Sequence, residues 1–398
     1  MLVEIHLLQN HSPSNLNRDD TGTPKECVFG GVKRARISSQ CLKRSIRRSE
    51  LFGEALENHL ATRTRRLPEL VAQRLKEEGV PDDLCRVAAK KLTGFGHGKG
   101  EEKEASKTGH YETRQTMFLT EADLAAVTGL MRDKTSRART AAELEKLKGG
   151  DLQKEAEQAG FRPITADVAL FGRMTTSEAF RDVEASAQVA HALSTHRVDH
   201  EFDYFTAVDD LQGLDEAERE EDAGADMIGD VEFNSACFYK YFSIDVRGLV
   251  ENLTGVRPFR REISEEERGL AAELAATAVA GMLEAAVRVT PSGKQNTFAA
   301  HQLPALVLVE CRPRRTPVSY ANAFVEPARP GRDGDLVAAS LKKLREHVEK
   351  LTTGFNLESS PRLLLAPEAP TDYQIDGVER LADLNTLRKR VGEAVLLA

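Results

Sequence analysis

Four side chains that can donate hydrogen bonds to phosphate share one face of a predicted helix. Gln40, Lys43, Arg44 and Arg47 are spaced i, i+3, i+4 and i+7, which places them in one line along a helix. Donors stacked in this way match the successive phosphates of a nucleic acid strand, and the N–H groups at the helix N-terminus add further donors. The pattern predicts a nucleic-acid contact. The alternative is an ordinary solvated basic face.

The charge around this helix is locally one-sided, although the chain of 398 residues carries a formal net charge of −8. Residues 25–48 contain eight Lys and Arg against one acid, Glu26, whereas residues 201–222 contain ten Asp and Glu against one base, Arg219. Uncompensated charge of this density repels itself unless a partner of opposite sign neutralises it. We expect the basic segment to bind a polyanion. The acidic segment is either a solvated flank or a contact to the basic surface of a neighbour.

Asp19 and Asp20 are the residues with the strongest claim to catalysis, because they sit in a turn-rich loop close to the basic helix. They raise the alternative of a metal-dependent ribonuclease, although two-metal cleavage needs several converging carboxylates and two adjacent aspartates rarely supply them. The five cysteines are scattered without zinc-site spacing, and no nucleophile-elbow motif is present in the sequence. The sequence therefore predicts a protein without catalytic residues, a metal or a cofactor.

The periodicity of apolar residues predicts a mixed α+β fold. Val3, Ile5 and Leu7 alternate with polar residues, which indicates a half-buried strand. The other expected elements are a helix capped by Ser38 or Ser39 and running to about Ser49, a charged and mostly helical segment over 51–165, strand character over 183–198, a long strand over 231–246, a helix opened by the capping box of Ser264 and Glu267, a buried strand over 305–309, a strand over 319–325, a helix capped by Asp335, and a C-terminal helix. This strand–helix–strand–strand–helix–strand order is ferredoxin-like with large insertions, and an RRM-like sheet fits it too.

Six short segments add a more specific signal. They are residues 12–20 (SPSNLNRDD), 29–44 (FGGVKRARISSQCLKR), 172–177 (GRMTTS), 190–196 (AHALSTH), 205–211 (FTAVDDL) and 293–297 (GKQNT). In this order they resemble the CasC-type crRNA-binding backbone subunit of the type I-E CRISPR Cascade complex, a member of the RAMP superfamily. The C-terminal 70 or so residues match that family only loosely.

The resemblance implies a fold shaped like a right hand. Residues 1–50, 183–197 and 231–398, the last with C-terminal helices, would form an RRM-like or ferredoxin-like palm. Residues 51–182 would form a helical fingers insertion, and residues 198–230 a β-hairpin thumb.

The resemblance also implies a function. Several copies would lie side by side on a guide RNA (crRNA), and each thumb would reach the neighbouring copy and displace one base at a regular interval. The remaining bases of the spacer would pair with target DNA in antiviral defence. The partners implied are the guide RNA, target DNA through the guide, neighbouring copies of the chain and the other Cascade subunits, with no catalysis by this subunit.

The family motifs also imply the residues of the RNA contact. These are Arg18, Lys25, Gln40, Lys43, Arg44, Arg47, Lys294 and Gln295, with Met174 as a wedge beside the displaced base. From its residue type alone a single methionine is more often core filler, although apolar wedges do insert between bases. The family context favours the wedge.

The sequence predicts a cytoplasmic protein. The N-terminus has no basic region followed by an apolar core, as a secretory signal would. The most apolar run, from Leu270 to Val289, is interrupted by Glu273, Glu284 and Arg288, so we expect no membrane span.

Overall fold

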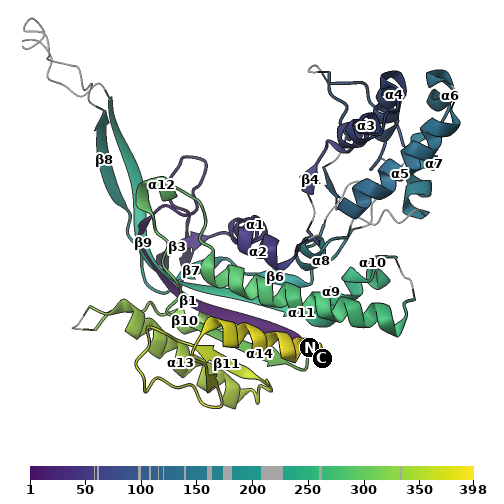
Figure 1. Ribbon diagram of the computed structural model, residues 1–398. Helices are drawn as coiled ribbons and strands as arrows, with labels where there is room; N and C mark the ends of the chain where they lie inside the picture. Colours follow the sequence, from purple (N-terminus) through teal and green to yellow (C-terminus); the bar gives the residue numbers. More distant parts are fainter. Residues whose placement is uncertain are drawn as a thin grey trace, which may run out of the picture. The chain divides into compact units, whose positions relative to one another are not determined.

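The first strand of the chain lies near the middle of a large, mostly antiparallel sheet (Figure 1). The computed structural model describes the chain except for residues 58, 61, 97–99, 107–108, 115, 120, 139, 159–163, 174–181, 208–226, 260–261 and 332–333. The described chain divides into two units. The first comprises Met1–Ser49, Val189–Ser243 and Met282–Ala394, and the second comprises Glu50–Gln188, Ile244–Gly281 and Val395–Ala398.

The sheet contains the predicted ferredoxin-like core. Its main path is β12 (Glu379–Arg380), β11 (Arg362–Leu365), β10 (Leu306–Arg312), β1 (Leu2–Ser14), β9 (Met227–Asp245), β7 (Ala192–Ser194), β3 (Val32–Ile37) and β2 (Glu26–Phe29). In the chain, β1, α1 (Ser39–Arg47), β7, β9, α11 (Glu265–Arg288) and β10 follow one another. In the sheet the four core strands lie in the order β10-β1-β9-β7. The predicted order of elements and the α+β class are confirmed.

Helices cover the core strands. Helix α13 (Leu336–Gly354) packs Leu341, Leu344 and Val348 against Leu8 of β1 and Leu306 of β10. Helix α1 and the last turns of α11 lie on the other side of the sheet (Figure 1). The remaining elements of this unit are α12 (Gln295–Phe298), the 3-10 helix η1 (Ala321–Phe324) and α14 (Leu384–Leu396).

A hairpin extends from the sheet. β8 (Glu201–Ala207) pairs antiparallel with the first part of β9, from Glu201 opposite Phe233 to Ala207 opposite Met227. Phe202, Tyr204 and Phe205 are exposed on β8, with 53%, 73% and 43% of their surface accessible. The thumb predicted over 198–230 includes this hairpin, whereas most of the acidic stretch over 201–222 lies outside the described residues.

The second unit is mainly helical. Its elements are α2 (Glu50–Ala55), β4 (Thr62–Thr64), α3 (Leu67–Glu77), α4 (Asp82–Leu92), β5 (Met117–Leu119), α5 (Glu121–Arg137), α6 (Ala141–Glu145), α7 (Gly149–Gln158), α8 (Ala166–Phe171), β6 (Ala187–Val189), α9 (Val246–Leu253), α10 (Val256–Phe259) and most of α11. Leu67, Val71, Phe95 and Met131 belong to one apolar core of this unit. Among the described helices, α11 alone is long and apolar enough to span a membrane, but 61% of its most apolar window is buried in the protein, as in a core helix.

The three predicted helix caps are present. The Cys41 N–H donates to Ser38 Oγ at 3.3 Å, and the Ala338 N–H donates to Asp335 Oδ1 at 2.8 Å. In the capping box, the Ser264 N–H donates to Glu267 Oε2 and the Glu267 N–H donates to Ser264 Oγ, both at 3.1 Å. Each cap satisfies N–H groups that the helix itself leaves without an acceptor.

Two strand predictions were wrong in detail. Residues 183–198 form only the three-residue strands β6 and β7, and residues 319–325 contain η1 instead of a strand. In residues 319–325, two backbone carbonyls accept hydrogen bonds from a side chain and not from a neighbouring strand. Arg34 Nη2 donates to the carbonyl of Phe324 at 2.7 Å and to that of Val325 at 3.3 Å. Such long-range pairing is invisible to local sequence patterns.

The prediction that β1 is half-buried was also wrong, because its polar face is buried as well. Glu4 accepts hydrogen bonds from Tyr241 Oη at 2.5 Å and from the Arg312 guanidinium. Glu310 accepts from Arg312 Nη2 at 3.0 Å and from Arg362 Nε at 2.8 Å. Two carboxylates are thus balanced by two guanidinium groups in the interior, which is the condition for burying charge without a large penalty.

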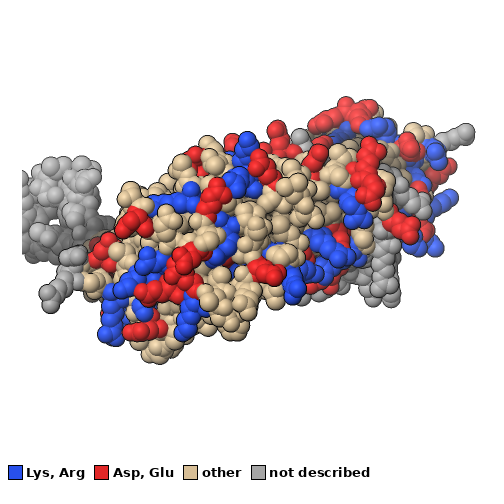
Figure 2. All heavy atoms as spheres, turned by 90° about the horizontal axis from the view of Figure 1, so that it is seen from below, with Lys and Arg blue, Asp and Glu red and all other residues tan. Residues whose placement is uncertain are grey.

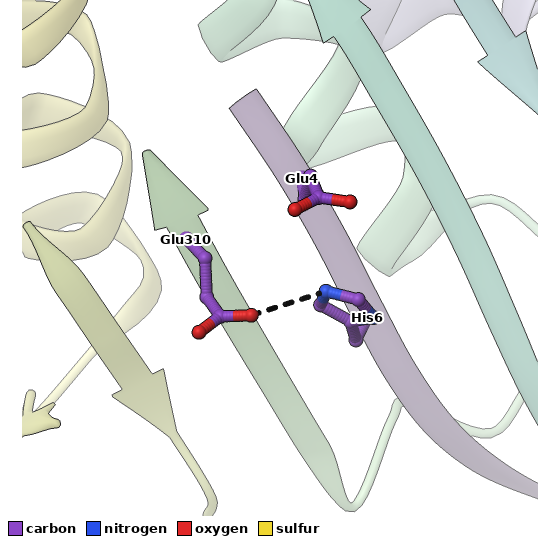
Figure 3. Close-up of side chains that lie close together, drawn as sticks. All are labelled: Glu4, His6 and Glu310. Atoms are coloured by element: carbon purple, nitrogen blue, oxygen red, sulfur yellow. Dashed lines mark ion pairs between the residues drawn. The ribbon is translucent and has the colours of Figure 1, made fainter. Parts of the chain in front are cut away.

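His6 completes this network beside Glu4 and Glu310 (Figure 3). Tyr239 Oη accepts from the Tyr320 N–H and lies 2.8 Å from His6 Nδ1, and His6 Nε2 lies 3.6 Å from Glu310 Oε2. The three residues have the spacing of a metal site. However, the carboxylates already accept from guanidinium and hydroxyl donors. The arrangement is a charge-balanced structural network.

Replacing His6 should make the protein less sensitive to acid. Burial lowers the pKa of His6 to about 4, whereas the unfolded chain takes up this proton near its ordinary value of 6.5. The folded state therefore loses stability relative to the unfolded state as pH falls from 6.5 to 4, by about 3 kcal/mol for this one group. Urea unfolding of His6→Phe across this pH range should give a flatter dependence than the wild type. His301→Phe, at an exposed position, is the control, and equal pH slopes in all three proteins would contradict this account.

Candidate nucleic-acid interface

Helix α1 presents the predicted donors on its outer face. Leu42 and Ile46 are buried, whereas Gln40 and Arg44 are exposed and Lys43 is half-buried. In the part of the chain that the structure describes, Lys43 and Arg44 form no salt bridge. Arg47 is half-buried and has an interaction partner within the chain, so it is not part of the unpaired set.

A hollow of about 520 Å³ beside α1 brings three distant parts of the chain together. It is lined by the 16–22 loop, by Cys41, Arg44 and Ser45 of α1, and by Ser292 and Gly293. Arg18 and Arg44 thus lie at one hollow, and Lys294 follows its last lining residue. The family motifs imply all three as RNA contacts; Arg18 and Arg44 line the hollow, and Lys294 is next to it in the sequence.

Positive charge gathers around Cys41 on the α1 wall of this hollow. Burial raises the pKa of the Cys41 thiol, while the charges of Lys25, Arg44 and Lys240 act in the opposite direction. Lys25 is held near the hollow because its N–H donates to the carbonyl of Asn17 at 2.8 Å. We call Lys25, Arg44 and Lys240 the basic cluster. Among the described residues, none of its three members has a salt-bridge partner.

Asparagine side chains, which the sequence analysis did not single out, position the 16–22 loop. Asn15 Nδ2 donates to the carbonyls of Gly22 at 3.0 Å and Glu232 at 2.9 Å, which ties the loop to β9. Asn17 Oδ1 accepts from the Ser38 N–H at 2.8 Å and so links the loop to the start of α1. The signal was present as two Asn residues in a turn-rich segment, a type that readily bonds to nearby backbone.

The Asp19 side chain stabilises the same loop through hydrogen bonds to residues that follow it in the sequence. Its carboxylate accepts from the N–H and hydroxyl groups of Thr21 and Thr23, at 2.7 to 3.0 Å. These hydrogen bonds, those of Thr23 first, lower the pKa of Asp19 to about 2. Asp20 is exposed and lines the hollow with Asp19. Both oxygens of Asp19 are therefore used by the loop.

The loop that carries Lys294 and Gln295 is fixed by close packing and by its own amide. A Cβ on Gly293 would lie 2.4 Å from the carbonyl oxygen of Leu16, so only glycine permits this approach. Lys294 is half-buried with a left-handed φ of 49°. Gln295 Nε2 donates to the Pro291 carbonyl at 3.0 Å, and its Oε1 accepts from the Ala300 N–H at 2.7 Å. The Gln295 side chain thus braces the loop, and its contact with RNA stays a prediction.

Several basic residues counted in the sequence are neutralised or buried. Lys33 pairs with Glu26 at 3.1 Å, and Arg36 Nη1 lies 3.0 Å from His191 Nδ1. Arg34 is fully buried, and its guanidinium donates to the carbonyls of Phe29, Ser194, Phe324 and Val325. Fewer of these cations are therefore available to an external ligand than the count over residues 25–48 indicated. Met174, the predicted wedge, lies outside the described residues.

The charges on the face that carries α13 and α14 are arranged differently. Figure 2 shows Lys and Arg interspersed with Asp and Glu over this face. Lys343 pairs with Glu326 at 3.5 Å and Arg390 with Glu379 at 2.8 Å. Paired charge of this kind serves solubility, whereas the basic cluster leaves its charge available to a ligand.

Comparisons with known proteins agree with the motif-based interpretation. Residues 3–389 match the model of the CT1975-like protein family, Cas_CT1975. The chain belongs to this family. No curated protein sequence matches it.

Two solved structures are similar to this CT1975-like protein over nearly its full length. A chain of a "CRISPR RNA-guided surveillance complex, pre-nicking" has 28% sequence identity and a TM-score of 0.80, and the match covers 99% of this chain and 100% of that one. A chain of a "CRISPR RNA-guided surveillance complex" has 25% identity and a TM-score of 0.69, with the same coverage. The predicted resemblance to a CRISPR complex subunit is confirmed at this level.

Substituting Gly293 should disturb the interface locally. The Cβ of Gly293→Ala must push away the backbone at Leu16, which should lower the free energy of unfolding by about 1–3 kcal/mol. Faster amide hydrogen exchange at residues 15–17 and 292–298 would locate the change. Gly269→Ala in α11 is the control, because nothing lies within 4 Å of its new Cβ, and it should be neutral or slightly stabilising. Equal exchange rates in both variants would show that the close approach does not matter.

Proposed function

We propose that this CT1975-like protein is a non-catalytic crRNA-binding backbone subunit of a type I-E Cascade complex. One observation carries the proposal: unpaired cations from separate parts of the chain converge around α1 and the adjoining hollow. A sugar-phosphate strand is the ligand that neutralises several such cations in a row. The full-length similarity to chains of CRISPR RNA-guided surveillance complexes supports RNA of the guide type as that strand.

The subunit then repeats along the guide. Contacts between one surface of a chain and a different surface of the next generate helical assemblies when they do not close, so several copies line up on one RNA. The exposed aromatic residues of the β8–β9 hairpin support a role for this hairpin at a neighbouring copy or at the bases. The spacer bases between contacts pair with target DNA. The partners are guide RNA, target DNA through the guide, further copies and other Cascade subunits, in the cytoplasm.

Removing two cations of α1 should weaken RNA binding and its dependence on salt. In Lys43→Ala/Arg44→Ala, alanine preserves the helix while two phosphate contacts are lost. The slope of log affinity against log salt should fall in magnitude by about 1.4, from about 0.7 per contact, and affinity near physiological salt should fall on the order of tenfold or more.

The control for this double variant is Lys342→Ala/Lys350→Ala, which removes two exposed lysines from α13. Filter binding with single-stranded RNA at several salt concentrations measures all three proteins. The control should keep the wild-type slope. Equal slopes for wild type and Lys43→Ala/Arg44→Ala would contradict the proposal.

A metal-dependent ribonuclease is the second candidate, and one observation favours it: Asp19 and Asp20 line the same hollow as Arg18 and Arg44. Against it, the Asp19 oxygens are used by Thr21 and Thr23. Among the described residues, the group of three with metal-ligand spacing is Glu4, His6 and Glu310, which includes neither aspartate.

Incubation of the RNA-bound protein with Mg²⁺ or Mn²⁺ separates these two functions. We expect the RNA to stay intact in the wild type. We also expect Asp19→Ala to lower RNA affinity because the 16–22 loop loosens, whereas Asp20→Ala should bind nearly as well as the wild type. Cleavage at regular intervals that is lost in Asp19→Ala would instead establish the ribonuclease.

A further inference from the structure

A lysine without a counter-ion is buried behind the hollow. Lys240 lies on β9 with 1% of its surface exposed, and its Nζ donates to Gln9 Oε1 at 2.5 Å. That amide oxygen is its one hydrogen-bond acceptor in the part of the chain that the structure describes, and no carboxylate pairs with it. Burial lowers the pKa of Lys240 to about 8. An unpaired cation in the interior costs stability, and such residues are concentrated at functional sites.

The surroundings of Lys240 direct its charge toward the hollow. On α1 it faces the thiol of Cys41, which itself lines the hollow. On β1 it faces Gln9 and the imidazole of His11, whose pKa is lowered to about 3 by burial first and by Lys240 second. The neighbouring strand β7 (Ala192–Ser194) contributes no titratable group. Asp19 and Asp20 also line the hollow, but in the described part of the chain neither forms a salt bridge with Lys240, and the Asp19 oxygens accept from Thr21 and Thr23. Lys240 therefore has no paired anion, and a phosphate in the hollow can act as one.

We propose that Lys240 is a buried positioning cation, which attracts an RNA phosphate at the hollow without touching it and takes up a proton when RNA binds. This inference rests on the proposed RNA-binding function. Across about 10 Å at an intermediate dielectric, one such charge is worth on the order of tenfold in affinity. Because the phosphate favours the charged lysine, binding and protonation strengthen each other.

The sign of the pH dependence follows. The protein with a protonated Lys240 binds RNA more tightly, so wild-type affinity should be highest below about pH 8. Affinity should fall as pH rises from the pKa of Lys240 in the free protein to its higher pKa in the RNA complex. Lys240→Met carries no charge there, so its affinity should equal the weaker limit at every pH. Its melting temperature should stay unchanged or rise, because the buried charge is gone. A residue with a purely structural role would not separate affinity from stability in this way.

The experiment is a titration with unstructured oligocytidine RNA, whose bases stay neutral throughout, at about pH 7 and about pH 9.5, on either side of the pKa of Lys240. Lys240→Met should lose on the order of tenfold in affinity at the lower pH and almost nothing at the higher one, with the wild-type salt slope. Lys342→Met removes an exposed lysine of α13 and is the matched control, which should behave as the wild type.

Calorimetry of the wild type near pH 8.5 decides the question even if Lys240→Met does not fold. Titrations in two buffers of different ionisation enthalpy should reveal uptake of a fraction of a proton per bound site. If the wild type binds RNA without proton uptake, or if Lys240→Met binds as tightly with the same pH profile, the inference about Lys240 is wrong while the proposed function stands. If the wild type does not bind RNA at either pH, both are wrong.

Discussion

Repulsion between like charges is the constraint that the candidate interface depends on. Lys25, Arg44 and the buried Lys240 lie around Cys41 beside the hollow, and Lys43 precedes Arg44 on α1. The described residues provide no salt bridge for any of them. Such an arrangement costs free energy in the isolated chain, and an anionic strand that spans the hollow would recover it. Under the proposed function, the guide RNA is that strand.

In the interior of the same unit, by contrast, carboxylates and guanidinium groups are paired. Glu4 and Glu310 are matched by Arg312 and Arg362, and the hydroxyl groups of Tyr241 and Tyr320 satisfy further carboxylate lone pairs. This network joins β1, β9, β10 and β11, the strands on which the rest of the sheet is assembled. Arg34, which has no carboxylate partner among the described residues, is satisfied by the carbonyls of four other residues. Lys240 differs from these groups, because its hydrogen bond to Gln9 Oε1 is the one contact of this kind that the described chain gives it.

Local patterns predicted most of the fold. Caps at Ser38, Ser264 and Asp335 and the order of strands and helices could be predicted because they depend on neighbouring residues and on apolar periodicity. The errors have a common physical cause in contacts between distant residues. The alternation of apolar and polar residues predicted that Glu4 and His6 face solvent. Instead both are buried, beside Arg312 and Glu310, which are about 300 positions away in the sequence. Arg34 was counted with the basic residues around α1, yet it is buried and its guanidinium donates to the carbonyls of Phe324 and Val325.

The candidate site could be predicted in part. Gln40, Lys43 and Arg44 do lie on α1, and the motif set brought in Arg18, which lines the hollow, and Lys294, which follows the lining residue Gly293. The roles of Asn15, Asn17 and Gly293 depend on how segments distant in the sequence meet, and so does the burial of Lys240, which donates to Gln9 of β1. No local pattern encodes either.

The most direct measurement of the central claim is ultraviolet crosslinking of the assembled ribonucleoprotein, followed by mass spectrometry of the crosslinked peptides. Our account predicts nucleotide adducts on peptides from residues 16–25, 39–47 and 292–298 and none on α13. Adducts confined to α13 or to other faces, with RNA bound, would contradict it.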